Sequence, residues 1–182
     1  MWYKVKRILK WVNWEEKQIY PKVIKETYSL TMWDGNFVSI AKSWHTIKQI
    51  DIETTIRFTW SWQLYFRICP TNSSSSQDVI SITASTLSVY WMRVQYGRDG
   101  VAWNNATTVL NSMSTGVDYV MKATFLLDSW TVTVNWSTVN INYTNISSII
   151  SWIFNWATPY WQSAGYYSNF VSNPVTYTVT YN

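Results

Sequence analysis

The alternation of hydrophobic and polar residues is clearest between residues 50 and 58. Apolar side chains stand at Ile50, Ile52, Ile56 and Phe58, and charged side chains stand between them at Asp51, Glu53 and Arg57. A period of two residues is typical of a β-strand with one face buried and the other in solvent. The segment therefore predicts a strand whose isoleucines enter a core.

Similar short segments follow one another along the chain, with turn residues between them. Two short strands are expected within residues 3–25. Further strands are expected at residues 63–69, 79–83, 87–96, 117–127, 131–134, 137–143 and 175–181. Within residues 117–127, one face would carry Val117, Tyr119, Met121, Ala123, Phe125 and Leu127. Many short strands with almost no helical periodicity predict an all-β fold, an antiparallel two-sheet sandwich.

The expected organisation is one sandwich domain with a short appendage. Residues 26–182 would form the β-sandwich, and residues 1–25 a short basic strand pair or anchoring segment. The alternation places ten side chains on interior faces: Ile50, Ile52, Ile56, Phe58, Phe66, Val89, Met121, Phe125, Val132 and Val139. The positions of Val132 and Val139 depend most on register, because a slip of one residue inverts the faces of a strand.

Charge is concentrated at the N-terminus. The net charge is +4, but residues 1–25 alone hold seven cationic and two acidic side chains, and no charged residue follows Asp128. The body therefore lacks the basic patch of a nucleic-acid-binding domain, and no nucleic-acid partner is expected. No apolar run approaches the roughly 18 residues of a membrane span, and no signal peptide is visible. The single Cys69 excludes an internal disulfide.

Tryptophan is abundant where turn glycines would be natural. The chain has 14 Trp and 5 Gly, and Asn135-Trp136 occupies a hairpin turn that favours Asn-Gly. One hypothesis is that many of these positions are UGA codons from a genetic system that reads UGA as glycine. Eight tryptophans would then cluster at strand ends, many of them exposed to solvent: Trp14, Trp33, Trp60, Trp62, Trp130, Trp136, Trp156 and Trp161. Positive φ at Trp136 would support the hypothesis, whereas a Trp-rich stacking surface is the alternative.

Residues from about 30 to 182 resemble the concanavalin A-like lectin/glucanase jelly roll of the laminin-G type. The resemblance lies in IDIETTIRFT running into QLYFRI, and in the order VDYVMKATFLLD, TVTVNW and STVNI. The opening YKVKRILKWVNWEEKQIYP also resembles N-terminal segments of phage virion and tail proteins. These resemblances imply a structural or receptor-recognition module with a virion or extracellular location. The implied partners are a polysaccharide or cell-surface glycan and other virion subunits, and a homo-oligomer is compatible with them.

The concanavalin A-like family includes enzymes, and residues 49–53 correspond to their catalytic strand. Laminarinase-type glucanases carry E-I-D-I-E on one strand, with the first Glu as nucleophile and the last as general acid/base. Here the run is Gln49-Ile50-Asp51-Ile52-Glu53, so Asp51 and Glu53 match and Gln49 replaces the nucleophile. Because an amide cannot form the glycosyl-enzyme ester, we expect no enzymatic activity. An active or degenerate glycoside hydrolase is the alternative, and ordinary solvent-facing charges would explain the same residues.

Glycan binding would require aromatic rings that stack on sugars. The candidates are Tyr65, Tyr90, Trp103, Tyr160, Tyr166 and Tyr167, for each of which packing in a core or between subunits is the simpler explanation. No cofactor is expected apart from calcium, which this fold sometimes binds. Asp34 and Asp99 lie in turns that could offer oxygen ligands to calcium, although turn formation alone explains both.

Overall fold

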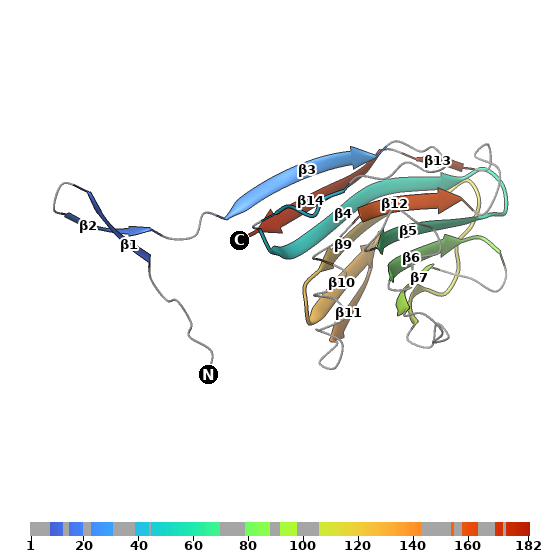
Figure 1. Ribbon diagram of the computed structural model, residues 1–182. Coiled ribbons are helices and arrows are strands. Elements are labelled where there is room, and N and C mark those ends of the chain that lie inside the picture. The colour runs from blue at the N-terminus through green and yellow to red at the C-terminus, as the bar shows by residue number, and fades with distance from the viewer. Residues whose placement is uncertain are drawn as a thin grey trace.

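The computed structural model describes residues 8–12, 15–19, 23–30, 39–43, 45–69, 79–87, 92–97, 106–142, 154, 158–163, 170–172 and 174–182. In these parts of the chain the strands form two layers of a sandwich and a separate two-stranded sheet (Figure 1). The small sheet pairs β1 (Ile8–Val12) with β2 (Glu15–Ile19), as the alternation near the N-terminus predicts. Among the described residues no helix has the length and apolar character to cross a membrane.

One layer of the sandwich is a seven-stranded antiparallel sheet. Its order is β11 (Ser137–Asn142), β10 (Ser129–Val134), β9 (Asp118–Phe125), β4 (Ile47–Phe58), β14 (Val175–Tyr181) and β3 (Ile24–Leu30), and β13 (Phe170–Ser172) also pairs with β4. The last strand, β14, inserts between β3 and β4 and pairs with both. The two ends of the sandwich domain are thus joined within one sheet.

The other layer is a five-stranded antiparallel sheet. Its order is β12 (Thr158–Ser163), β5 (Gln63–Cys69), β6 (Val79–Ser85), β7 (Met92–Gly97) and β8 (Thr107–Leu110). Side chains from the inner faces of both sheets form one hydrophobic core. The expected antiparallel two-sheet sandwich is therefore confirmed.

The interior positions predicted from alternation are largely confirmed. Eight of them are buried: Ile50, Ile52, Ile56, Phe58, Phe66, Met121, Phe125 and Val132. Val139 is partly buried and packs against the core, and Val89 lies outside the described residues. On β9 the predicted face is buried from Tyr119 to Phe125, but Val117 is 43% exposed because it precedes the strand.

The expectation for the tryptophans holds in part. Trp60 and Trp136 are exposed, by 70% and 98% respectively, and Trp62 packs partly buried against the core. The expectation is wrong for Trp130, which lies in β10 and is 1% exposed because its ring packs edge-to-face on Phe125. Trp161 also lies within a strand, β12. Trp14, Trp33 and Trp156 lie outside the described residues.

The turn between β10 and β11 departs from the expected geometry. Among the described non-glycine residues only Asn135 has positive φ, at 52°, so Trp136 does not. The turn therefore differs from type I′, in which both central residues have positive φ. Asparagine tolerates the left-handed region better than other non-glycine residues. A tryptophan at the second position therefore causes no backbone strain.

Candidate functional site

The outer face of the five-stranded sheet carries a polar patch in place of ordinary solvent-facing residues. On β6, Ile80, Ile82 and Ala84 enter the core, and the intervening Ser81 and Thr83 take the opposite face. The register places Ser81 opposite Arg67 of β5 and Gln95 of β7, and Thr83 opposite Tyr65 and Arg93. We call these six residues the β5–β7 polar patch: Tyr65, Arg67, Ser81, Thr83, Arg93 and Gln95.

The centre of the patch is buried and short of hydrogen-bond partners. Ser81 and Thr83 are 0% exposed and Gln95 is 3% exposed. Within the described chain, the Ser81 and Thr83 hydroxyls and the Gln95 side-chain carbonyl oxygen make no hydrogen bond. Native proteins pair nearly all buried polar groups, because each orphan costs about 1–3 kcal/mol. Three such groups therefore lie close together on two neighbouring strands.

The rim of the patch is aromatic and cationic. Tyr65, Arg67 and Arg93 are each half-buried, and the Arg67 guanidinium lies 4.7 Å from the centre of the Tyr65 ring. An aromatic ring and two guanidinium groups thus belong to the strands on either side of the buried hydroxyls. These three rim residues are the partly accessible members of the patch.

One predicted glycan-binding residue lies in the patch, and a second is on the neighbouring strand β12. Tyr65 belongs to the patch, and the register of β12 places Tyr160 opposite Arg67. Tyr90, Trp103, Tyr166 and Tyr167 lie outside the described residues. The serine, threonine, glutamine and arginines of the patch were not predicted from the sequence. Polar residues that alternate with apolar ones have the same pattern whether they face solvent or a ligand.

The catalytic candidates lie on the other sheet, on its outer face. The Gln49 amide donates to both oxygens of the Asp51 carboxylate, at 2.9 and 2.7 Å, and the Thr124 hydroxyl donates to Asp51 at 2.6 Å. Glu53 forms an ion pair with Lys122 at 3.0 Å, with both side chains about 60% exposed. Both carboxylates thus have partners within the protein, and the position of the nucleophile holds an amide.

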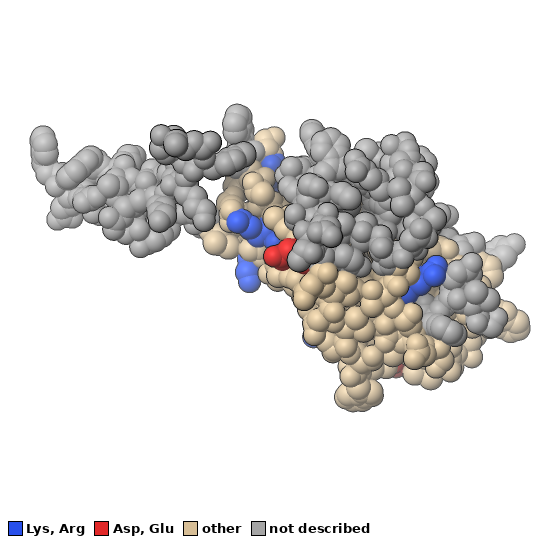
Figure 2. Space-filling model, turned by 90° about the horizontal axis from the view of Figure 1, so that it is seen from below, with Lys and Arg blue, Asp and Glu red and all other residues tan. Residues whose placement is uncertain are grey.

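Other hydroxyl groups on the outer face of the seven-stranded sheet form hydrogen bonds with side chains of the neighbouring strand. Thr131 donates to the Asn140 side chain at 2.8 Å, and the Thr133 and Thr138 hydroxyl oxygens lie 3.0 Å apart. These groups are also exposed, so water can complete their bonding. Figure 2 shows the molecule from below, where the few charged side chains in view lie at the margins of the described surface. Among the described residues, the β5–β7 polar patch therefore has more polar groups without hydrogen-bond partners than these hydroxyl groups of the seven-stranded sheet.

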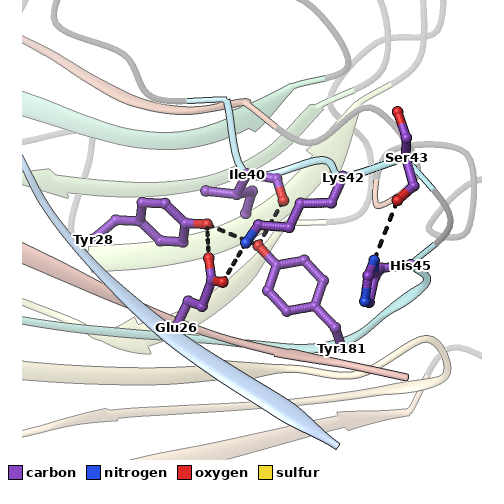
Figure 3. A network of polar contacts seen from close by, with 7 residues as sticks. All are labelled: Glu26, Tyr28, Ile40, Lys42, Ser43, His45 and Tyr181. Carbon is purple, nitrogen blue, oxygen red and sulfur yellow. Dashed lines mark hydrogen bonds and ion pairs between the residues drawn. The ribbon is translucent and has the colours of Figure 1, made fainter. Parts of the chain in front are cut away.

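A second polar cluster ties the edge strand β3 to the C-terminal strand (Figure 3). The Tyr28 hydroxyl donates to Glu26 at 2.6 Å and lies 3.0 Å from the Tyr181 hydroxyl, which donates to the Ile40 carbonyl at 2.7 Å. Lys42 forms an ion pair with Glu26 and lies 5.3 Å from the centre of the Tyr181 ring. Because these groups satisfy one another, the cluster acts as a structural clamp.

The clamp makes stability depend on pH through Glu26. The hydrogen bonds from Lys42 and Tyr28 lower the pKa of Glu26, and burial followed by the hydrogen bond to Glu26 raises the pKa of Tyr28. A lowered folded-state pKa contributes stability above the unfolded value of about 4.3 and loses it as the pH falls through the folded value. We expect the wild type to lose more stability than Glu26→Gln between about pH 5 and pH 3, in urea denaturation at each pH.

Two comparisons complete that experiment. Lys42→Met should reduce the acid dependence as Glu26→Gln does, because it removes the other half of the pair. Both effects should shrink at high salt, since the pair is about one-third exposed. If Glu26→Gln had the same pH dependence of stability as the wild type, the acid dependence could not be assigned to Glu26.

The described residues hold no group of three or more His, Cys, Asp or Glu side chains that could bind a metal ion. Asp34 and Asp99, the calcium candidates, lie outside those residues. Calcium binding by these turns therefore stays a prediction.

Comparison with known proteins identifies the fold. No protein-family model and no curated protein matches the sequence. Among solved structures, sheep galectin-11 in complex with glycerol is similar with a TM-score of 0.55 and 9% identity, covering 80% of this chain and 99% of that one. A Caenorhabditis elegans galectin is similar with a TM-score of 0.52 and 8% identity, covering 85% and 94%. The chain therefore has the jelly-roll sandwich fold that galectins share with concanavalin A-like proteins, which confirms the expected fold.

Proposed function

We propose that this chain is a non-enzymatic glycan-recognition β-sandwich that binds saccharide at the β5–β7 polar patch. The observation that carries the proposal is the burial of three polar groups without partners, on Ser81, Thr83 and Gln95, within the described chain. Saccharide hydroxyls can donate to and accept from such groups. A ligand that pairs them would recover the cost of their burial.

The rim supports the same choice of ligand. A tyrosine ring offers an apolar surface for a sugar ring, and polar groups placed around it fix the orientation of the ligand. Tyr65 lies in the patch beside Arg67, and Tyr160 is one strand further along the same register. Saccharide binding would use both the ring and the hydroxyls.

Thr83→Val gives a test in which stability and binding change in opposite directions. The substitution keeps the shape of the side chain and removes a buried hydroxyl that has no hydrogen-bond partner among the described residues. The free protein should become more stable by about 1 kcal/mol, while affinity for its saccharide falls about tenfold. Thermal unfolding and calorimetric titration with the best saccharide from a glycan array would measure the two effects.

Thr133→Val is the matched control, since Thr133 lies on the outer face of the other sheet and bonds to Thr138. It should leave saccharide affinity unchanged. Equal affinities of the wild type and Thr83→Val would place the binding site elsewhere.

The glycoside hydrolase alternative rests on Asp51 and Glu53, which lie on the opposite face of the molecule from the patch. Their hydrogen bonds to Gln49 and Thr124 and the ion pair with Lys122 favour a structural role. Release of reducing sugar that Glu53→Gln abolishes would replace our proposal with an enzymatic one.

We also propose a virion or extracellular setting, on the resemblance of the basic N-terminal segment to phage virion and tail proteins. The neighbours of the gene test this directly. The same DNA tests the recoding hypothesis for exposed tryptophans such as Trp60 and Trp136. UGA codons at these positions would support it, and UGG throughout would end it.

A further inference from the structure

The sandwich has an edge strand at each end of its two sheets, and three of these strands have a feature that hinders pairing with a further strand. β12 contains Pro159, which lacks a backbone N–H, and β8 has only four residues and a register shift where it pairs with β7. β11 is linked to the other sheet, because the Ser137 hydroxyl donates to the Val109 carbonyl of β8 at 2.8 Å. Among the described edge strands, β3 has no feature of this kind.

Strand β3 presents a regular backbone edge. It pairs with β14 in an unbroken register over all seven residues, from Ile24 opposite Tyr181 to Leu30 opposite Val175. Among the described strands it pairs with β14 alone, and it forms the margin of the seven-stranded sheet (Figure 1). The backbone N–H and C=O groups on its outer side are therefore placed to pair with one more strand.

The two charged side chains of β3 do not oppose such pairing. An inward-facing charge often protects an edge strand, because it cannot be covered by a partner. Here Glu26 forms an ion pair with Lys42 and accepts a hydrogen bond from Tyr28, all within one chain. Lys25 is exposed on the other face of the strand, where its side chain can extend into water. The edge therefore carries its charges in a form that a second strand can accept.

The sequence of β3 is complementary to itself in one antiparallel register. With Thr27 opposite Thr27 of a second copy, all seven residues of each strand are paired. Lys25 then lies opposite Ser29 of the other copy, and Glu26 lies opposite Tyr28. Moving the register by one step in either direction leaves the ends of β3 unpaired, and in one direction it places Glu26 opposite Glu26. Like charges directly opposite each other destabilise a sheet, so the register centred on Thr27 is favoured.

We propose that two copies of this chain pair antiparallel through β3, centred on Thr27, and so join their seven-stranded sheets into one continuous sheet. The contact is isologous, because each copy contributes the same strand. Residues directly opposite each other in an antiparallel pair point to the same face, so the two-fold axis is perpendicular to the joint sheet. A pair of seven-residue strands is a small interface, and we expect a dissociation constant in the micromolar range.

The dimer would place both five-stranded sheets on the same side of the joint sheet. The two β5–β7 polar patches would then face in one direction, away from the joint sheet. This consequence, unlike the pairing itself, rests on the proposed glycan-binding function. Two patches directed the same way can bind one glycan-coated surface together, and the avidity then exceeds the affinity of either site.

Sedimentation velocity of the full chain, from about 1 to 100 μM, tests the pairing. The wild type should be dimeric at the upper end of this range. Thr27→Lys and Thr27→Glu each place like charges directly opposite each other and should weaken dimerisation about tenfold or more. An equimolar mixture of the two variants should restore the dimer, because a lysine then faces a glutamate at the centre of the pair.

Thr138→Lys is the matched control, because Thr138 has the same setting on β11, the opposite edge of the same sheet. Both threonines are exposed, and each lies within hydrogen-bonding distance of a threonine on the next strand, Thr178 for Thr27 at 3.3 Å and Thr133 for Thr138 at 3.0 Å. Thr138→Lys should dimerise as the wild type does. Thermal unfolding of all three variants should show that each still folds.

The outcomes separate this proposal from the glycan-binding function. A wild type that stays monomeric at about 100 μM would overturn the pairing, as would a dimer that Thr27→Lys and Thr27→Glu leave intact or that only Thr138→Lys disrupts. Failure of the mixed variants to dimerise would overturn the register centred on Thr27. A dimer that binds no saccharide would leave the pairing in place and overturn the glycan-binding function alone. Equal retention of the wild type and Thr27→Lys on a surface coated with the best saccharide would overturn the shared direction of the two patches.

Discussion

Trp130→Ala is expected to destabilise the fold by about 3–5 kcal/mol, the largest effect that we predict for a single substitution. Trp130 is 1% exposed and lies opposite Phe125 on the neighbouring strand, with ring centres 5.1 Å apart and planes at 81°. The substitution removes the most voluminous of the fully buried side chains in the described part of the chain, together with an edge-to-face aromatic contact. Chemical denaturation should show the loss, and the melting temperature should fall by about 10 °C.

Trp136→Ala is the control, since it makes the same change six positions away on a side chain that is 98% exposed. It should change stability by less than about 0.5 kcal/mol. Similar stabilities for the two variants would contradict the burial of Trp130.

The contrast between the two positions also bears on the hypothesis that some tryptophans stand in place of glycines. A glycine at position 130 would leave a cavity in the core, whereas a glycine at position 136 would leave the core intact.

Asn135→Ala is expected to cost about 2 kcal/mol, from a non-glycine residue at positive φ and two lost side-chain hydrogen bonds. The Asn135 N–H donates to the Val120 carbonyl at 2.9 Å, and its side-chain oxygen accepts from the Val120 N–H at 2.8 Å. Its side-chain NH₂ donates to the Asp118 carbonyl at 3.2 Å. Asn135 thus extends the ladder between β10 and β9 by one residue, with its side chain acting as the acceptor.

Asn135→Gly separates the two contributions. Glycine adopts φ near 52° without strain but makes neither side-chain hydrogen bond. Its loss in urea denaturation should therefore be about 1 kcal/mol, between the wild type and Asn135→Ala. If glycine were more stable than asparagine at this position, the side-chain contacts would not be stabilising.

Alternation predicted the strands that have one apolar and one polar face. Strands β4, β9 and β10 were identified because each presents a run of inward apolar residues, such as Ile50 and Ile52, against polar neighbours. Strand β8 has only four residues, too few to show a period. Strand β12 was not predicted; it contains Pro159 and lies at the edge of its sheet, where a proline is tolerated.

The candidate site was harder to predict than the fold. Tyr65 could be proposed from the sequence because aromatic rings stack on sugars. Ser81 and Thr83 have the same pattern as polar residues on the solvent-facing side of any strand. Only the three-dimensional structure shows that these hydroxyls are fully buried and have no hydrogen-bond partner among the described residues. Arg67 and Arg93 are 26 residues apart in the sequence, and only the pairing of β5, β6 and β7 places them on either side of the same two hydroxyls.

The most direct test of glycan binding at the β5–β7 polar patch is a backbone amide NMR titration with the best saccharide from the array. Our account predicts that the largest shift changes lie on β5, β6 and β7, around Arg67, Thr83 and Gln95, while β10 and β11 change little. Changes concentrated around Asp51 and Glu53 on the other sheet would contradict it, as would a saccharide that perturbs neither sheet.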